Sequence, residues 1–154
     1  MTIQLALAIA LHQLATVVWI GGMFFAHFAL RPSAQWVLDP PRRLPLLLAV
    51  FDRFFPWVWA AVIALWGSGI WILGGIYQAS LGWHVHAMTG IALIMSVLFV
   101  YLYFVPYRAM ATAVAAQDWI SAGARLAVIR RIIGVNLVLG LLNAAIGASG
   151  RYLQ

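Results

Sequence analysis

Three side chains that can bind a metal ion alternate in the segment GWHVHAM, which spans residues 82 to 88. They are His84, His86 and Met88. Residues two positions apart point to opposite sides of a helix, so only one of the two histidines can face a protein interior. We expect His86 to face inward, and His84 to share the opposite face with Met88. The segment therefore predicts two half-sites rather than one cluster.

A further histidine, His12, lies among apolar residues of a long hydrophobic stretch. Thr16 and Trp19 follow it at i+4 and i+7, so the three share one helix face, with Gly22 and Met23 beyond them. Histidine inside a membrane costs free energy unless it has a partner. The face predicts either a surface for a flat, bulky ligand or a structural histidine bonded to a neighbouring helix.

The first interpretation of these residues is a haem b site. His12 and His86 would be the two axial ligands of the haem iron, because imidazole nitrogen is a common axial ligand. Trp19 would lie beside the macrocycle, and Asn143 would donate a hydrogen bond to a histidine or to a propionate. Such a protein would transfer electrons to or from a quinone or a periplasmic redox partner.

The second interpretation is a copper site. His84 and Met88, with His86 where the turn is not yet helical, would bind copper at the mouth of the third apolar segment, because imidazole and thioether are suitable ligands for Cu(I). His12 would then be a deeper relay toward the other side of the membrane. Trp19, Met23 and His27 would continue that path, with His27 close to the membrane surface beside Arg31.

Composition decides which elements must position these residues. The chain is 66% hydrophobic and 8% charged, with a mean hydropathy of +1.00. Soluble domains are about 25% charged, so this chain is predicted to be an integral membrane protein. The absence of cysteine excludes disulfides, thiolate metal sites and cysteine nucleophiles. Lysine and glutamate are also absent, and no acid–base pair can be recognised, so no catalytic residue is assigned.

Four apolar segments are long enough to cross a bilayer, which takes about 20 residues each. They cover residues 3–30, 55–77, 83–107 and 132–149. We therefore predict an all-α bundle of four transmembrane helices that forms a single domain over residues 1–154. The segment PRRLPLLLAVFDRFF, between the first two spans, predicts either a short interfacial helix or a proline-interrupted loop.

The arginines give the bundle a predicted orientation. Loops 31–54 and 108–131 carry four arginines each, whereas the loop between the second and third spans carries none. The positive-inside rule places these two loops in the cytoplasm and both termini outside. In a bacterial inner membrane, GWHVHAM then faces the periplasm. The net charge of +6 is explained by this topology, so no nucleic-acid partner is expected.

Small residues and tryptophans support a third interpretation, a non-catalytic subunit of a larger membrane complex. Gly140, Ala144 and Ala148 form a strip that would permit close helix contact or a homodimer. Asn136 is expected to make an interhelical hydrogen bond. The eight tryptophans would act as anchors at the membrane interface.

The segment LHQLATVVWIGGMFFAHFALRP resembles the opening of the CopD-type copper-resistance membrane domain. It also resembles, more distantly, the HemJ-type protoporphyrinogen oxidases. In both families a histidine precedes a tryptophan by seven residues, as His12 precedes Trp19 here. The resemblance continues through FDRFFPWVWAAVIALWGSGIWIL and GWHVHAMTGIALIM.

The two resemblances imply different functions. The CopD type implies copper handling across the inner membrane. The HemJ type implies a b-type haem on the first-span histidine, His12, and a lysine near the start of the third span. This chain has Ala87 or Met88 near that position, which counts against protoporphyrinogen oxidation. We predict a small b-type cytochrome-like protein with an electron-transfer or redox role and leave open whether it is a haem-dependent oxidoreductase, with CopD-type copper transport as the alternative.

Overall fold

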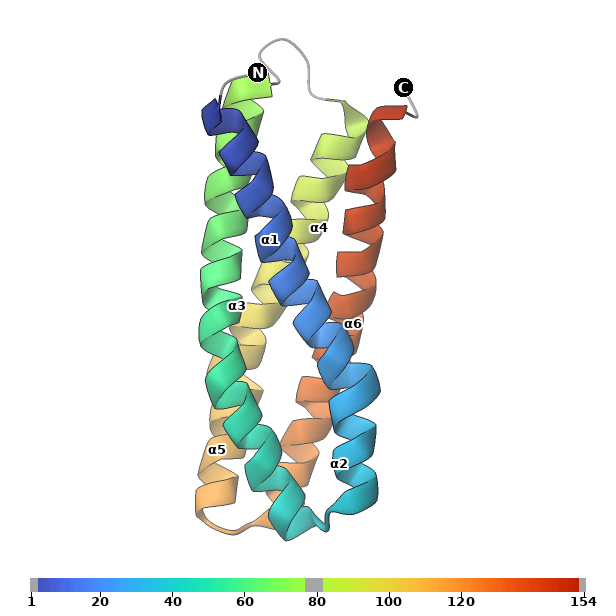
Figure 1. Ribbon diagram of the computed structural model, residues 1–154. Coiled ribbons are helices and arrows are strands. Elements are labelled where there is room, and N and C mark those ends of the chain that lie inside the picture. The colour runs from blue at the N-terminus through green and yellow to red at the C-terminus, as the bar shows by residue number, and fades with distance from the viewer. Residues whose placement is uncertain (1–2, 77–81, 153–154) are drawn as a thin grey trace.

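Four long helical runs stand side by side in the computed structural model, which describes residues 3–76 and 82–152 (Figure 1). The first run consists of α1 (Ile3–Phe25), the π-helical segment η1 (Ala26–Leu30) and α2 (Arg31–Val37). The second is α3 (Pro40–Ile76). The third consists of α4 (Trp83–Leu102), the π-helical segment η2 (Tyr103–Tyr107) and α5 (Arg108–Ala115). The fourth is α6 (Trp119–Ser149), which ends in the 3-10 turn η3 (Gly150–Tyr152).

The predicted fold class is confirmed. The described residues contain no strand, and each of the four runs is long and apolar enough to cross a membrane. Many large apolar side chains are exposed on the outside of the bundle, for example Leu14, Ile63 and Val97. A surface of this kind matches hydrocarbon rather than water. The molecule is therefore a multi-pass membrane protein.

The helices extend beyond the spans expected from hydropathy. The segment PRRLPLLLAVFDRFF, residues 41–55, forms neither a proline-interrupted loop nor a separate interfacial helix, because α3 begins at Pro40 and continues through Pro45 and Pro56. The reason is a buried stripe within this stretch, formed by Leu44, Leu47 and Phe51 at helical spacing. At ~1.5 Å per residue, the 37 residues of α3 measure ~55 Å, well over the ~30 Å of a hydrocarbon core.

The helices also extend beyond the predicted spans elsewhere in the chain. Residues 108–131 contain α5, a short turn and the first turns of α6, so this predicted loop is also largely helical. The last residue of the predicted second span, Tyr77, lies outside the described residues. The third and fourth predicted spans lie wholly within longer helical runs.

The four runs are arranged as two helix pairs. α1 packs along α3, and α4 packs along α6, while α5 lies against the first half of α6 (Figure 1). The indole Nε1–H of Trp66 on α3 donates to Ser96 Oγ on α4 at 3.1 Å and so joins the pairs. Phe99 of α4 joins them again, because its ring lies edge-on to Trp19 of α1 and Phe55 of α3, with centroids 6.2 and 5.7 Å apart.

The two ends of the bundle differ in charge. We call the end formed by α2, α5 and the first turns of α3 and α6 the arginine end, because eight of the nine arginines lie in that half (Figure 1). The opposite end, where α4 begins and α6 finishes, is the terminal end, since both chain termini lie there. His84 and Met88 belong to the terminal end.

Candidate functional site

His84 is the buried histidine of the GWHVHAM segment, with only 3% of its surface exposed. It packs on Gly150, in the turn that finishes α6. A Cβ added to Gly150 would lie 2.5 Å from the Cβ of His84 and 2.9 Å from its Cγ. These distances are too short for any ordinary contact, so the approach of the two helices depends on glycine. The end of α6 therefore holds His84 at the interface between α4 and α6.

Met88 lies one helical turn after His84 and faces the same neighbour. A Cβ added to Gly147 of α6 would lie 2.8 Å from the Cε of Met88 and 3.4 Å from its Sδ. Gly147 and Gly150 are three residues apart, so they share one face of α6. The imidazole of His84 and the thioether of Met88 are thus presented together to α6, as their i, i+4 spacing predicts.

His86 is exposed, so the expectation that it faces the interior is wrong. The two histidines do point to opposite sides of α4, and His84 does share a face with Met88, as predicted. His84 faces the interior instead, because the face of α4 that carries His84 and Met88 packs against the glycines of α6. The proposed haem therefore lacks an inward-facing second ligand at His86.

Asn143 places an oxygen on the same α4–α6 interface. It precedes Gly147 by four residues and Gly150 by seven, which is one helix face. Its Oδ1 is buried and has no hydrogen-bond partner among the described residues. Within residues 3–76 and 82–152, no group of three His, Cys, Asp or Glu side chains could hold a metal ion.

His12 lies in the other helix pair, where its Nδ1 is 2.9 Å from Ser68 Oγ of α3. The one hydroxyl proton of Ser68 is donated to the backbone carbonyl of Ala64. With the Ser68 proton on that carbonyl, Ser68 accepts from an Nδ1–H of His12, and Nε2 then carries the lone pair. A neutral imidazole in this tautomer can bind a metal through Nε2. A histidine with a purely structural role can have the same tautomer, so the tautomer does not distinguish the two roles.

The predicted haem residues do not meet at one interface. His12 packs on α3, whereas His86 is exposed on α4 and Asn143 lies between α4 and α6. Trp19 is 3% exposed and belongs to the aromatic contacts in the middle of the bundle. His27 lies on η1 against Gly134 of α6, whose added Cβ would be 3.3 Å from the His27 Cε1.

Met95 is a candidate that the sequence analysis missed. It is 2% exposed and follows Met88 by seven residues, so it lies on the same face of α4, two turns further into the bundle. The backbone carbonyl of Met95 accepts a hydrogen bond from Asn136 Nδ2 at 3.1 Å. This bond confirms the interhelical role expected of Asn136. The i+7 spacing from Met88 is the signal that could have identified Met95.

The fold and this site define a multi-pass helical membrane protein with imidazole and thioether groups inside its bundle. A family model described as copper resistance protein D matches residues 48–149, about two thirds of the chain. The chain therefore belongs to the copper resistance protein D family. The matched stretch contains His84, Met88 and Asn143, and His12 lies before it. In two further comparisons, no curated protein and no solved structure matched the chain.

The family membership confirms the CopD-type resemblance and favours the copper interpretation over the haem interpretation. No finding supports the HemJ-type resemblance, and haem binding stays an untested prediction.

Proposed function

We propose that this protein binds copper at the terminal end of the bundle and passes it through a bacterial inner membrane. The observation that carries the proposal is the pairing of His84 and Met88, one turn apart on the face of α4 that meets α6. Imidazole and thioether suit Cu(I). Both residues lie within the stretch that matches the copper resistance family.

The proposed orientation makes this an entry site. The positive-inside rule places the arginine end in the cytoplasm. The terminal end, with His84 and Met88, then faces the periplasm. Copper would be captured outside and would move along the interface between α4 and α6.

Buried methionines support a path beyond the entry site. Met95 follows Met88 on the same face of α4, and Met23 of α1 is 4% exposed further toward the arginine end. Weak ligands at successive depths allow an ion to enter and also to leave. His27 on η1 would lie near the exit. His12, which packs on α3, would be a side ligand rather than a member of this path.

The test is the Cu(I) affinity of the purified protein, measured under reducing, anaerobic conditions by competition with bicinchoninate. We expect His84→Gln and Met88→Leu each to weaken binding by about ten-fold or more, since even groups that only orient a metal ligand are worth that much. His86→Gln is the matched control, because His86 lies two residues away and is exposed. The chain has no cysteine, so no thiolate of its own competes for Cu(I).

Equal losses in His84→Gln and His86→Gln would contradict the proposal, as would unchanged binding in Met88→Leu. Thermal melts of each variant separate lost ligation from lost folding. Met88→Leu conserves volume and should cost less than about 1.5 kcal/mol of stability.

Haem binding is the second candidate, and its support is the Nδ1–H tautomer of His12, which leaves Nε2 as the donor atom. The same variants separate the two functions. A haem held by His12 and His86 predicts that His86→Gln loses the Soret band of haem-loaded protein and that Met88→Leu keeps it. The copper proposal instead predicts that Met88→Leu weakens Cu(I) binding and that His86→Gln leaves it unchanged.

A further inference from the structure

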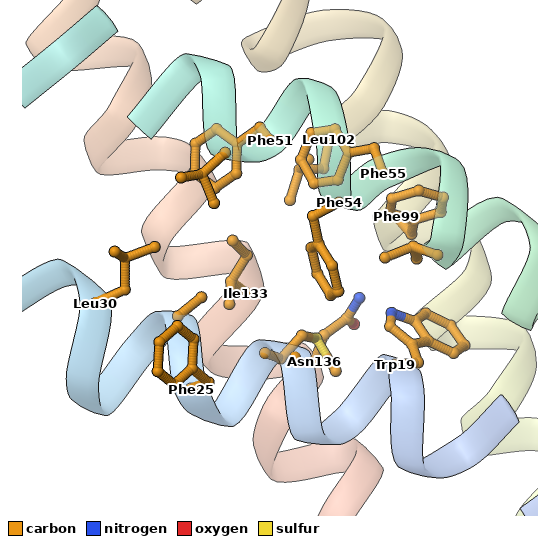
Figure 2. Close-up of a pocket in the computed structure, with 15 residues that line it drawn as sticks. Trp19, Phe25, Leu30, Phe51, Phe54, Phe55, Phe99, Leu102, Ile133 and Asn136 are labelled. Atoms are coloured by element: carbon orange, nitrogen blue, oxygen red, sulfur yellow. The ribbon is translucent and has the colours of Figure 1, made fainter. Parts of the chain in front are cut away.

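An apolar cavity of about 120 Å³ lies between the two helix pairs, toward the arginine end (Figure 2). Phenylalanine, leucine, valine and isoleucine side chains make up most of its wall, among them Phe54, Phe99 and Ile133. Asn136 and the indole of Trp19 provide the strong hydrogen-bonding groups of its lining, beside the weak thioether acceptor of Met23. The cavity thus combines a hydrophobic wall with one small polar spot.

Asn136 brings an unused acceptor to this spot. Its side chain is 2% exposed, and its Nδ2 is occupied by the backbone carbonyl of Met95. Its Oδ1 is buried and has no hydrogen-bond partner among the described residues. A buried polar atom left in this state costs about 1–3 kcal/mol. A ligand that donates a hydrogen bond would recover this free energy.

Trp19 brings a donor to the same spot. Figure 2 shows its ring nitrogen and the Asn136 carboxamide turned toward one another at the cavity wall. The indole is 3% exposed, and Trp19 is among the residues that line the cavity. One donor and one acceptor in the lining of one cavity are complementary to a hydroxyl group, which can accept from Trp19 and donate to Asn136.

The size of the cavity favours an aromatic ring over water. Buried waters need 2–4 polar partners and about 30 Å³, whereas an apolar cavity of about 150 Å³ can hold benzene. The cavity volume of about 120 Å³ is close to that of the benzene-binding cavity, and aromatic rings form part of its wall. Phe25 also lines the cavity and is 60% exposed on the outside of the bundle, so the site borders the lipid phase.

We propose that this cavity binds a small monocyclic phenol from the lipid phase. The ring occupies the space between Phe54, Phe99 and Ile133. The phenolic hydroxyl accepts from Trp19 Nε1–H and donates to Asn136 Oδ1. This site is separate from the His84–Met88 pair. It shares Met23 with the proposed copper path, and its binding of phenol can be measured in the absence of copper.

The test uses the asparagines of the chain, which number two, Asn136 and Asn143. Protein labelled with [15N]asparagine and held in detergent micelles gives side-chain amide signals from these residues alone, and an Asn143→Gln variant assigns them. We expect phenol to shift the Asn136 signals saturably and to leave those of Asn143 in place. Benzene should bind about ten-fold more weakly, since a net hydrogen bond of about 1.4 kcal/mol corresponds to that factor.

Two variants test the recognition. Trp19→Phe keeps a ring but removes the N–H, so the preference for phenol over benzene should fall several-fold. Ala26→Leu adds side-chain volume at the cavity wall and should abolish the shift, with Ile133→Phe as its replacement if it does not fold. Equal responses to phenol and benzene, an unchanged response in the filled cavity, or no response of Asn136 would each overturn the proposal.

Discussion

Individual glycines determine how closely the candidate ligands approach the next helix. An added Cβ at Gly150 would lie 2.5 Å from the Cβ of His84, a backbone-proximal atom that cannot swing away. Gly69, beside His12, differs, because its added Cβ would lie 3.5 Å from the His12 Cε1, an ordinary contact distance. His84 therefore depends on its glycine, and His12 does not.

Substitution of these two glycines should have opposite effects. We expect Gly150→Ala to push α6 away from His84, to destabilise the protein by about 1–3 kcal/mol and to weaken Cu(I) binding. Gly69→Ala should be neutral or stabilising by up to about 1 kcal/mol, since alanine is favoured over glycine within a helix. Unfolding in mixed micelles at increasing denaturing-detergent fraction measures both. Similar losses in the two variants would argue against the contact at His84.

The chemistry of the GWHVHAM segment could be predicted in part. Helical geometry alone places His84 and His86 on opposite faces and Met88 with His84, and the structure agrees. The inward face could not be predicted, because α4 is apolar on all sides and lipid is as apolar as a protein interior. The contact with Gly147 and Gly150 determines the inward face, and these glycines belong to α6, the last long helix of the chain.

At the scale of the element, the start of α6 depends on a local hydrogen bond. Gln117 has a φ of 56°, which turns the chain between α5 and α6. Asp118 is the N-cap of α6, and its Oδ1 accepts from the backbone N–H of Ser121 at 3.0 Å. Hydrogen bonds from the side chain and from the backbone N–H of Ser121 lower the pKa of the exposed Asp118 carboxyl below its ordinary value of 3.8.

The cap gives stability a defined pH dependence. Because the pKa of Asp118 is lower in the folded state, its contribution is fully present above the unfolded-state pKa and is lost as the pH falls through the folded-state pKa. Asp118→Asn keeps a capping oxygen that does not titrate. We expect the melting temperature of the wild type to fall more steeply than that of the variant below about pH 4. Parallel curves from pH 7 to pH 3 would rule out this role.

Element boundaries were predicted less well than element number. Hydropathy predicts a span only where charged residues are absent. The predicted second and fourth spans therefore began after Arg53 and Arg131, although α3 and α6 already begin at Pro40 and Trp119. Leu44, Leu47 and Phe51 carry the periodic signal that continues α3 there. Within the predicted small-residue strip of α6, Gly140 is buried, whereas Ala144 and Ala148 are exposed.

At the scale of the whole molecule, two serines of similar geometry hold different parts together. Ser68 and Ser96 each donate their proton to the backbone carbonyl four residues earlier. Each also pairs with a ring nitrogen of another helix. Ser68 bonds to Nδ1 of His12 within the α1–α3 pair, and Ser96 accepts from Nε1–H of Trp66 between the pairs. The bond to Ser68 favours one tautomer of His12, and the bond to Ser96 joins the two helix pairs.

Alanine at each serine separates these roles. We expect Ser96→Ala and Ser68→Ala to lower stability by similar amounts, about 0.5–1 kcal/mol, because each removes one interhelical hydrogen bond. Only Ser68→Ala should alter the 15N spectrum of [15N]histidine-labelled protein, since His12 then loses the acceptor that keeps its proton on Nδ1. An unchanged His12 spectrum in Ser68→Ala would contradict the tautomer assigned here.

The overall architecture could be predicted from composition and hydropathy, but the helix pairing and the cavity could not. Both depend on which apolar faces meet. In a chain whose outer surface is as apolar as its core, the pattern of residues does not distinguish them. Gly22 illustrates this, because its added Cβ would lie 2.2 Å from the ring of Phe54, a close approach that helps to position a cavity-lining side chain.

The position of Gly150 in the last turn of α6 has a consequence for the rate at which an ion could exchange. Helix ends open locally at a small fraction of the free energy needed for global unfolding. Fraying of η3 would remove the Gly150 contact from His84 without disturbing the lipid-embedded helices, since this contact lies at the outermost turn. The residence time of a copper ion at the proposed entry site would then depend on how often the end of α6 opens locally. The rate of copper uptake could therefore change without a change in the stability of the bundle.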